Sequence, residues 1–332
     1  MEPIRTLLKR AGAGLALASL VFLEGGAPAS PKTPTFEAHW QDGRAELDGY
    51  QYTVTRYGQA RRGTAIMVFV TEPFSQSKRV KVDDPAANPS DTFEALKLNF
   101  IRDFQTGIYD YNTMVSLFVR SRDFSPVKIS FSSAEWCGHV YEEMIFSSAQ
   151  IADSYRSYFE GESREVTLDW VAKGFAPRGL TEEELLVRLR DLRGQWIRPG
   201  DSLPVPFLPS SFLRRLAHAR LGWSEASIAR SKATETISVP AGSFATSRYT
   251  VTVPGMRVGR FWIEQSYPHR LIRWEWKPTG PATRGGFGPG EALDAGALTG
   301  SARLPYWKLH NEGDESYLRQ LGLSAGVGGA RR

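Results

Sequence analysis

The feature that most limits how this chain can fold is a repeated alternation of apolar and polar side chains at every second residue. It recurs at 50–54, 96–100, 129–131, 249–253 and 272–276 of the 332-residue sequence. Successive side chains of a strand point to opposite faces of a sheet, so each run predicts a strand with one apolar face. Turn signals such as Tyr57-Gly58 and Pro254-Gly255 separate the runs. We therefore predict a mainly β protein, with one long, curved antiparallel sheet in the form of a half-barrel or incomplete barrel.

The segment at 175–222 breaks this alternation and predicts a small helical insertion. Thr181 and Glu184 have the spacing of a capping box, and leucines follow at helical spacing through residue 192. A second helix is predicted within Ser210–Leu221, after the proline-rich stretch Pro199–Pro209. The mature chain then divides into an N-terminal β block at 30–174, the insertion at 175–222, a C-terminal β block of the same domain at 223–312 and a partly disordered tail at 313–332.

Three local patterns carry further expectations. The continuous apolar run Ala65–Val70 predicts a strand covered on both faces. Asp48-Gly49 predicts a turn. The stretch Pro278–Gly300, rich in Gly, Pro and Ala, predicts a mobile loop.

Residues 1–29 have the composition of a cleaved secretory signal. Basic residues at positions 5, 9 and 10 precede the apolar run Ala11–Leu23, and Ala27-Pro28-Ala29 forms a small-x-small cleavage signature. The apolar run has 13 residues, fewer than the ~20 that a membrane-spanning helix needs. We expect export to the periplasm, or alternatively to the cell exterior, and a protein that is soluble after signal cleavage.

Charge and motif content narrow the function classes. The formal net charge is +5 without a dense Lys/Arg block, which argues against a nucleic-acid partner. The single cysteine, Cys137, excludes an internal disulfide. The sequence has no G-x-S-x-G, H-E-x-x-H or phosphate-loop motif, so we expect no cofactor and no metal site.

The densest candidate site is the stretch Glu135-Trp136-Cys137-Gly138-His139. On a strand, Cys137 and His139 would point to the same face, where the imidazole could activate the thiol as a catalytic nucleophile. The same pair could supply two ligands to a soft metal. Alternatively, Cys137 is a small buried residue and His139 a hydrogen-bonded one, with structural roles.

A second candidate is the polar and aromatic stretch containing Tyr109, Asp110, Tyr111 and Asn112. Its side chains could line a ligand mouth through stacking and hydrogen bonds. The competing interpretation is a hairpin whose tyrosines pack on the sheet.

Aromatic residues of the C-terminal block form a third candidate. Trp262 and Trp274, with Phe261, Tyr267 and Trp276, could line an apolar cavity inside the curved sheet, and Trp136 could contribute to ligand binding. In an all-β protein such residues are more often core.

The C-terminal block also resembles a known group. Val239-Pro240-Ala241-Gly242-Ser243-Phe244, then Arg260-Phe261-Trp262-Ile263 and the strand Leu271–Trp276, resemble a broad group of uncharacterised exported bacterial proteins. In that group a V-P-A-G-x-[FY] turn joins two strands and a W-[IV] strand follows. The resemblance covers about 50 residues from Ala233. It implies an open, curved sheet similar to that of the periplasmic lipoprotein carriers, and it implies no catalytic residues.

Three functions follow as alternatives. The first is an envelope protein that binds or carries a hydrophobic or amphiphilic ligand such as a lipid, with the insertion as a lid over an apolar cavity. The second is an envelope structural or interaction protein, which contacts envelope proteins through sheet edges or a basic surface around Arg214, Arg215 and Arg220. The third is a cysteine-dependent enzyme that uses Cys137 and His139.

Overall fold

One curved, open sheet of 15 strands dominates the structure, a computed structural model that describes residues 35–170, 178–280 and 294–324. The predicted fold class is confirmed. The strands are β1 Ala45–Arg56, β2 Gln59–Ser75, β3 Thr92–Thr106, β4 Tyr109–Arg120, β5 Pro126–Glu135, β6 Gly138–Phe146, β7 Gln150–Ser157, β8 Arg164–Asp169, β9 Leu180–Thr181, β10 Ser202–Leu208, β11 Ser224–Val239, β12 Gly242–Val253, β13 Arg257–Glu264, β14 Leu271–Pro278 and β15 Asp294–Leu304. The helices are α1 Phe36–Trp40, α2 Glu182–Arg188 and α3 Ser211–Ala217, with the 3-10 helices η1 Tyr306–Lys308 and η2 Asp314–Leu321.

The first and last strands lie side by side in the middle of the sheet. The spatial order is β8 to β1, then β15 back to β9, and β1 pairs with β15 in antiparallel register from Ala45↔Leu304 to Val54↔Asp294. All neighbours are antiparallel except β9 and β10. The chain between β8 and β9 therefore connects the two edge strands of the sheet. These edges approach each other, since Trp223 donates its indole N–H to the Asp169 carbonyl at 3.2 Å, but within the described residues no strand pairing closes the sheet into a barrel.

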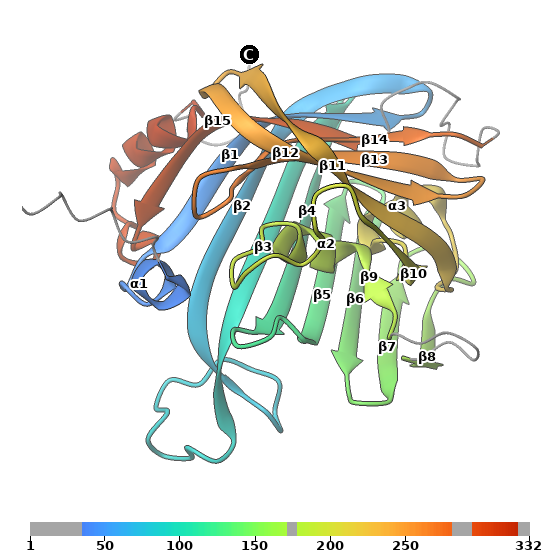
Figure 1. Ribbon diagram of the computed structural model, residues 1–332. Coiled ribbons are helices and arrows are strands. Elements are labelled where there is room, and N and C mark those ends of the chain that lie inside the picture. The colour runs from blue at the N-terminus through green and yellow to red at the C-terminus, as the bar shows by residue number, and fades with distance from the viewer. Residues whose placement is uncertain (1–34, 171–177, 281–293, 325–332) are drawn as a thin grey trace, which may run out of the picture. The chain divides into compact units, whose positions relative to one another are not determined.

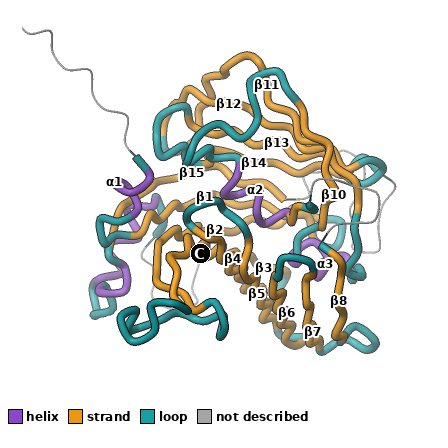
Figure 2. Tube along the Cα trace, turned by 60° about the horizontal axis from the view of Figure 1, so that its bottom comes forward, coloured by secondary structure: helices purple, strands orange, loops and turns teal. Residues whose placement is uncertain are grey.

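The main core fills the concave face of the sheet, the face that curves around α2 and α3 (Figure 2). Residues 34–332 form one compact unit. Trp274 is central to this core, because its ring packs edge-on against Tyr50 and Phe100, with centroids 4.9 and 5.5 Å apart. Leu185 of α2 and Leu216 of α3 cover the same core from the other side. The insertion thus supplies the second apolar layer that a curved sheet needs.

Smaller clusters cover parts of the convex face. Met67 and Phe69 of β2 point into the concave core, whereas Val68 and Val70 pack on the convex face near Tyr306. The prediction that Ala65–Val70 is covered on both faces is therefore confirmed.

Two local expectations are wrong. Asp48-Gly49 lies inside β1 at a bulge, not at a turn. A Cβ on Gly49 would lie 2.3 Å from the Leu321 carbonyl oxygen, so glycine is needed there because η2 packs directly on the strand.

The second error concerns Pro278–Gly300. Residues from Asp294 onward form β15, because their backbone pairs with β1 and β14 despite the weak strand propensity of Ala and Gly. Residues 281–293 lie outside the described residues.

The insertion contains the predicted elements and two strands that were not predicted. Thr181 caps α2 with the full capping box to Glu184. The second helix, α3, ends at His218 in the left-handed conformation, earlier than the predicted Leu221. β9 and β10 join the sheet at its β11 edge. Within the expected tail, Asp314–Leu321 forms η2 and Leu321 is buried, while residues 325–332 and the signal-like residues 1–29 lie outside the described residues.

Candidate functional site at the aromatic end of the sheet

Four consecutive hairpins of the N-terminal half turn at the same end of the sheet. Their tips are Tyr57-Gly58, Gly107-Ile108, Trp136-Cys137 and residues 158–163. Antiparallel hairpins reverse direction at alternate ends, so the loops 76–91, 121–125 and 147–149 lie at the opposite end. We call the four tips the aromatic end and the other three loops the polar end. The loop 76–91 and the β6–β7 turn of the polar end project at the bottom of Figure 1.

The aromatic end carries the four most exposed large apolar side chains among the described residues. They are Ile108 (80% exposed), Trp136 (70%), Tyr158 (67%) and Tyr57 (50%), one on each tip. The polar end exposes mainly Ser, Asp, Lys and Arg, with Val80 as its one large exposed apolar side chain. Turns normally carry polar residues, so apolar residues on four successive tips form an unusual, one-sided row.

Neighbouring tips contact one another. The hydroxyl of Tyr109 donates to that of Tyr57 at 3.3 Å, and the Tyr109 and Trp136 rings lie 6.4 Å apart. The backbone N–H of Tyr158 donates to the His139 carbonyl at 3.1 Å. The four tips therefore form one continuous surface.

Three tyrosine hydroxyls and one arginine meet beneath this surface. The hydroxyls of Tyr57 and Tyr111 lie 3.0 Å apart, and the Arg56 guanidinium donates to Tyr111 and lies 4.3 Å from the centre of the Tyr57 ring. Burial raises the pKa of Tyr57, but hydrogen bonds from Tyr109 and Tyr111 and the Arg56 charge outweigh it and lower that pKa below its usual value. We call these four residues the tyrosine cluster.

Backbone geometry fixes Tyr57 in this position. Tyr57 and Gly58 have φ of 57° and 72°, as in a type I′ hairpin turn. A bulky side chain at positive φ is uncommon, and such residues concentrate at functional sites. Tyr111 is held by stacking on Phe104, with centroids 4.8 Å apart and planes 8° apart.

Cys137 and His139 both lie at the aromatic end but do not share a strand face. Cys137 occupies the second position of the β5–β6 turn and is exposed, whereas His139 lies on β6. The geometry assumed for a thiol–imidazole pair is therefore absent, because the turn and not a strand places the thiol. No hydrogen bond between the two side chains occurs among the described residues.

The remaining predicted ligand residues separate into four places. Tyr109, Tyr111 and Trp136 belong to the aromatic end, whereas Asp110 and Asn112 are exposed on the other face of β4, where Asn112 bonds to Asp103. Trp274 is buried in the concave core, and its indole N–H donates to Asp294 at 2.6 Å. Trp262 faces the convex side and donates to Glu235 at 3.1 Å.

The concave face holds a small cavity beneath α2. Its volume is about 30 Å³, close to the share of one water molecule in the liquid, ~30 Å³. Phe261, Trp274 and Trp276 supply aromatic walls, and Glu183 and Asp294 supply polar ones. Burial, and then the Glu182 charge, raise the pKa of Glu183 to about 7. This cavity has no room for an acyl chain.

A larger groove lies on the convex face, between the C-terminal 3-10 helices and strands β1 and β15. Its volume is about 580 Å³. The apolar residues that line it include Leu47, Leu304, Leu309, Tyr317 and Leu318.

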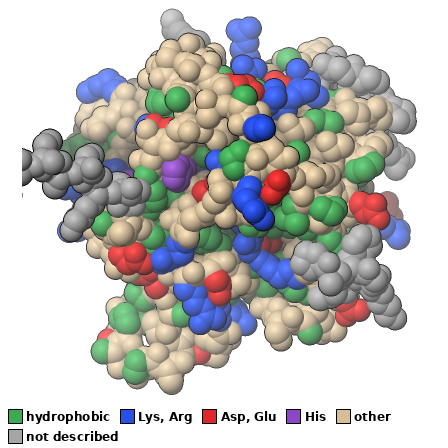
Figure 3. Space-filling model, viewed as in Figure 1, with side chains coloured by type: hydrophobic (Ala, Val, Ile, Leu, Met, Phe, Trp, Pro, Cys, Tyr) green, Lys and Arg blue, Asp and Glu red, His purple; other side chains and the backbone are tan. Residues whose placement is uncertain are grey.

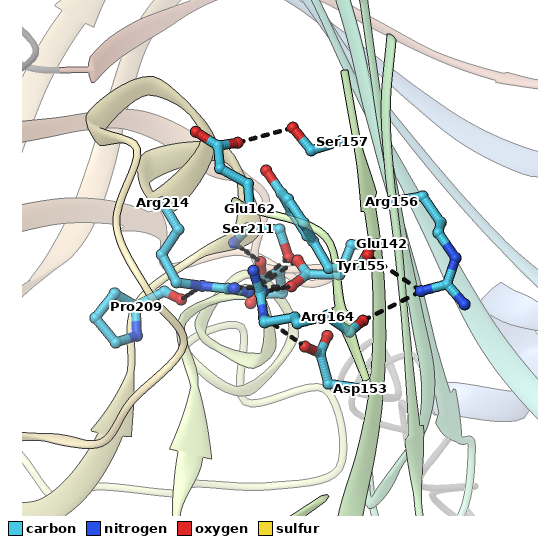
Figure 4. A network of polar contacts seen from close by, with 11 residues as sticks. Glu142, Asp153, Tyr155, Arg156, Ser157, Glu162, Arg164, Pro209, Ser211 and Arg214 are labelled. Carbon is cyan, nitrogen blue, oxygen red and sulfur yellow. Dashed lines mark hydrogen bonds and ion pairs between the residues drawn. The ribbon is translucent and has the colours of Figure 1, made fainter. Parts of the chain in front are cut away.

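Buried ion pairs fasten the insertion to the sheet. Arg214 of α3 contacts Glu142 of β6, which also accepts from Arg164, while Arg164 donates to Asp153 (Figure 4). Arg215 pairs with Glu135 of β5. Arg214 and Arg215 are buried, so they cannot belong to the expected basic interaction surface, of which only Arg220 is exposed. The sequence pattern did not reveal their carboxylate partners on distant strands.

The visible surface is mixed in charge, with Lys and Arg interspersed with Asp and Glu (Figure 3). Among the described residues, no group of three or more His, Cys, Asp or Glu side chains could hold a metal ion. In this part of the chain, no helix combines the length and apolarity needed to cross a bilayer.

Comparison with known proteins adds little to this geometry. No family model matches the chain, and no curated protein matches it significantly in sequence. One solved structure that matches, from Bacteroides fragilis, is provisionally described as an exported protein with a YmcC-like fold; it is 11% identical, and the match covers 79% of this chain and 97% of that one. The TM-score of 0.21 is too low to support an argument. The resemblance based on the V-P-A-G-x-F turn stays a prediction.

The sequence pattern did not single out Tyr57, Arg56 or the row of tips, because Tyr57-Gly58 was interpreted only as a turn. A signal was nevertheless present. Type I′ turns favour Asn, Asp or Gly at their first position, and this chain has tyrosine there.

Proposed function

We propose that this protein is an exported cell-envelope protein that binds the surface of a lipid assembly through the aromatic end of its sheet. The observation that carries the proposal is the row of four exposed apolar side chains on successive hairpin tips, opposite a polar end. Export is expected from the signal-like residues 1–29.

The chemistry of the tips suits a lipid surface. Tyrosine and tryptophan combine an apolar ring with one polar group, and they favour the boundary between lipid headgroups and acyl chains. Ile108 has no polar group and is the most exposed of the four, so it would enter deepest. A stable protein partner would need about 800 Å² of well-packed surface on each side, whereas the surface of the four tips offers one large exposed apolar side chain per tip.

The interior of the curved sheet supports surface binding over enclosed carriage. Among the described residues, the cavity beneath α2 on the concave face has a volume of about 30 Å³, too small for an acyl chain. An acyl chain would have to displace α2 and break its buried ion pair between Glu182 and Arg257 of β13. Breaking a buried pair costs about 3–5 kcal/mol.

The convex groove is a second candidate site for an amphiphile. Its volume of about 580 Å³ falls in the range of ordinary small-molecule sites, roughly 300–1,000 Å³. It would hold a single amphiphile, and not a lipid surface, because η1 and η2 enclose it on one side.

Vesicle flotation tests the proposal. The processed chain, residues 30–332, is mixed with phosphatidylcholine vesicles, so that the apolar run Ala11–Leu23 does not itself contact lipid. The double variant Ile108→Ser/Trp136→Ser should reduce partitioning about tenfold or more, because burial of each large apolar side chain contributes roughly 1.5–3 kcal/mol. Val80→Ser, at the polar end, is the matched control.

Each outcome has a defined meaning. If Val80→Ser and the double variant lose vesicle partitioning equally, the aromatic end has no special role in binding. Loss only in Leu309→Asp would move the site to the convex groove. If the wild-type chain does not float with vesicles, the proposed function is wrong.

A further inference from the structure

Arg56 is a buried cation without a carboxylate partner. The residue is 3% exposed, and no Asp or Glu lies within 4.0 Å of its guanidinium in the described part of the chain. Its bonds go to neutral groups: Nη1 donates to the Leu216 carbonyl at 2.7 Å and Nε to the Tyr111 hydroxyl at 3.3 Å. Buried charges are normally paired, so an unpaired guanidinium requires a reason.

A second buried arginine lies in this region, but it has a carboxylate partner of its own. Arg215 is also buried, and it forms its own ion pair with Glu135. Of these two buried guanidinium groups, only that of Arg215 has a carboxylate within ion-pair distance among the described residues.

The hydroxyls around Arg56 form a connected chain: Tyr109 donates to Tyr57 at 3.3 Å, and Tyr57 also accepts from Nη2 of Arg56 at 3.4 Å. A hydroxyl can rotate its one proton toward a ligand. Tyr111 is buried, whereas Tyr57 is half exposed and Tyr109 partly exposed. Hydrogen bonding to Tyr57 raises the pKa of Tyr109, and burial together with the same bond raises that of Tyr111, so both remain protonated donors. Burial raises the pKa of Tyr57, but hydrogen bonds from Tyr109 and Tyr111 and the Arg56 charge lower it overall, and the same contacts would favour an oxyanion placed here.

We infer that the tyrosine cluster binds an oxyanion of the phosphate type, with Tyr57 and Tyr109 as hydroxyl donors and Arg56 as the counter-charge. Each guanidinium nitrogen of Arg56 already donates to Tyr111, Leu216 or Tyr57. An oxyanion held by the hydroxyls would add the negative charge that the guanidinium lacks. The cluster lies between the tips of β1–β2, β3–β4 and β5–β6. An anionic headgroup would reach it when the tips enter a lipid surface. This last step depends on the proposed function; the anion site itself does not.

The experiment uses two vesicle compositions and inorganic phosphate. Residues 30–332 are measured with pure phosphatidylcholine vesicles and with vesicles containing 30% phosphatidylglycerol, and phosphate binding is measured by calorimetry. We expect about tenfold tighter binding to the anionic vesicles. Tyr57→Phe/Tyr109→Phe should abolish this preference while keeping the binding to phosphatidylcholine, since both rings remain. Tyr141→Phe, at an exposed tyrosine of β6 outside the four tips, is the matched control and should change neither kind of binding.

The outcomes separate the two proposals. Loss of all vesicle binding in Ile108→Ser/Trp136→Ser, with phosphate binding retained, would support both. Phosphate binding that depends on Tyr57 and Tyr109, in a chain that ignores vesicles, would support the anion site and reject the lipid surface. An anionic preference that persists in Tyr57→Phe/Tyr109→Phe, without phosphate binding, would overturn the anion site, because the net charge of the chain then explains the preference.

Discussion

Arg214 and Glu142 form a bidentate ion pair across 72 positions of sequence, with Nη1–Oε1 at 2.7 Å and Nη2–Oε2 at 2.9 Å. The pair is buried and joins α3 to β6. Because Glu142 also holds Arg164, the contact links the insertion to the outer strand β8 as well.

Removal of this arginine should loosen the insertion. Arg214→Met leaves Glu142 buried without its bidentate partner, and breaking such a pair costs about 3–5 kcal/mol. Urea unfolding should show a loss of roughly 3 kcal/mol in the free energy of unfolding. Arg220→Met, on the same segment but exposed, should change it little. Equal stability of Arg214→Met and wild type would mean that the pair does not hold α3.

Asp153 should make stability depend on pH. Burial, and then the adjacent Glu142 charge, raise the pKa of Asp153 to about 7, whereas an unfolded Asp titrates near 3.9. The folded state therefore binds more protons between about pH 4 and 7, and this group makes stability fall as pH rises through that window. Residue 153 cannot titrate in Asp153→Asn. The free energy of unfolding of this variant, relative to that of wild type, should therefore increase by about 1 kcal/mol or more between pH 5 and pH 8.

Urea unfolding of both proteins at the two pH values checks this expectation. Using the difference between them cancels the contribution of other titrating groups, such as Glu183. A difference that stays constant with pH would rule out a raised pKa at Asp153.

Gly296 should not tolerate a side chain. It lies opposite Trp274 in the β14–β15 pairing, and a Cβ there would lie 2.0 Å from the indole ring. Gly296→Ala should displace the indole from Asp294 and destabilise the protein by about 1–3 kcal/mol, the usual cost of overpacking. Thermal unfolding followed by tryptophan fluorescence measures the loss. Gly222→Ala, whose Cβ would meet open space, serves as the control; comparable losses in both variants would contradict this packing.

The thiol of Cys137 should react in the native protein. Its turn position is exposed, so alkylation by iodoacetamide should proceed within roughly one order of magnitude of the rate in the unfolded chain. A much faster native rate at neutral pH would indicate an activated thiolate and favour the enzyme alternative. Labelling that requires denaturation would contradict the exposed turn.

Part of this candidate site was accessible from local pattern. Tyr109, Tyr111 and Trp136 stood out because aromatic residues occurred near turns between good strands. Local pattern also predicted the alternating strands, the α2 capping box and the burial of β2 on both faces. Periodicity and capping depend on residues within a few positions of one another, so they can be recognised in the sequence.

The rest depended on register between distant segments. Tyr57 meets Tyr109 and Tyr111 only because β1 to β4 pair in one alignment, and Arg214 is buried only because α3 lies on β6. The sequence by itself determined most of the long strands and which face of each is apolar, since side-chain alternation is a local property of the chain. It did not determine β9, β10 or β15, whose strand character depends on pairing with other segments. Only the tertiary structure decided which hydroxyls and charges meet, because the pairing of strands and helices brings together residues 52 to 72 positions apart.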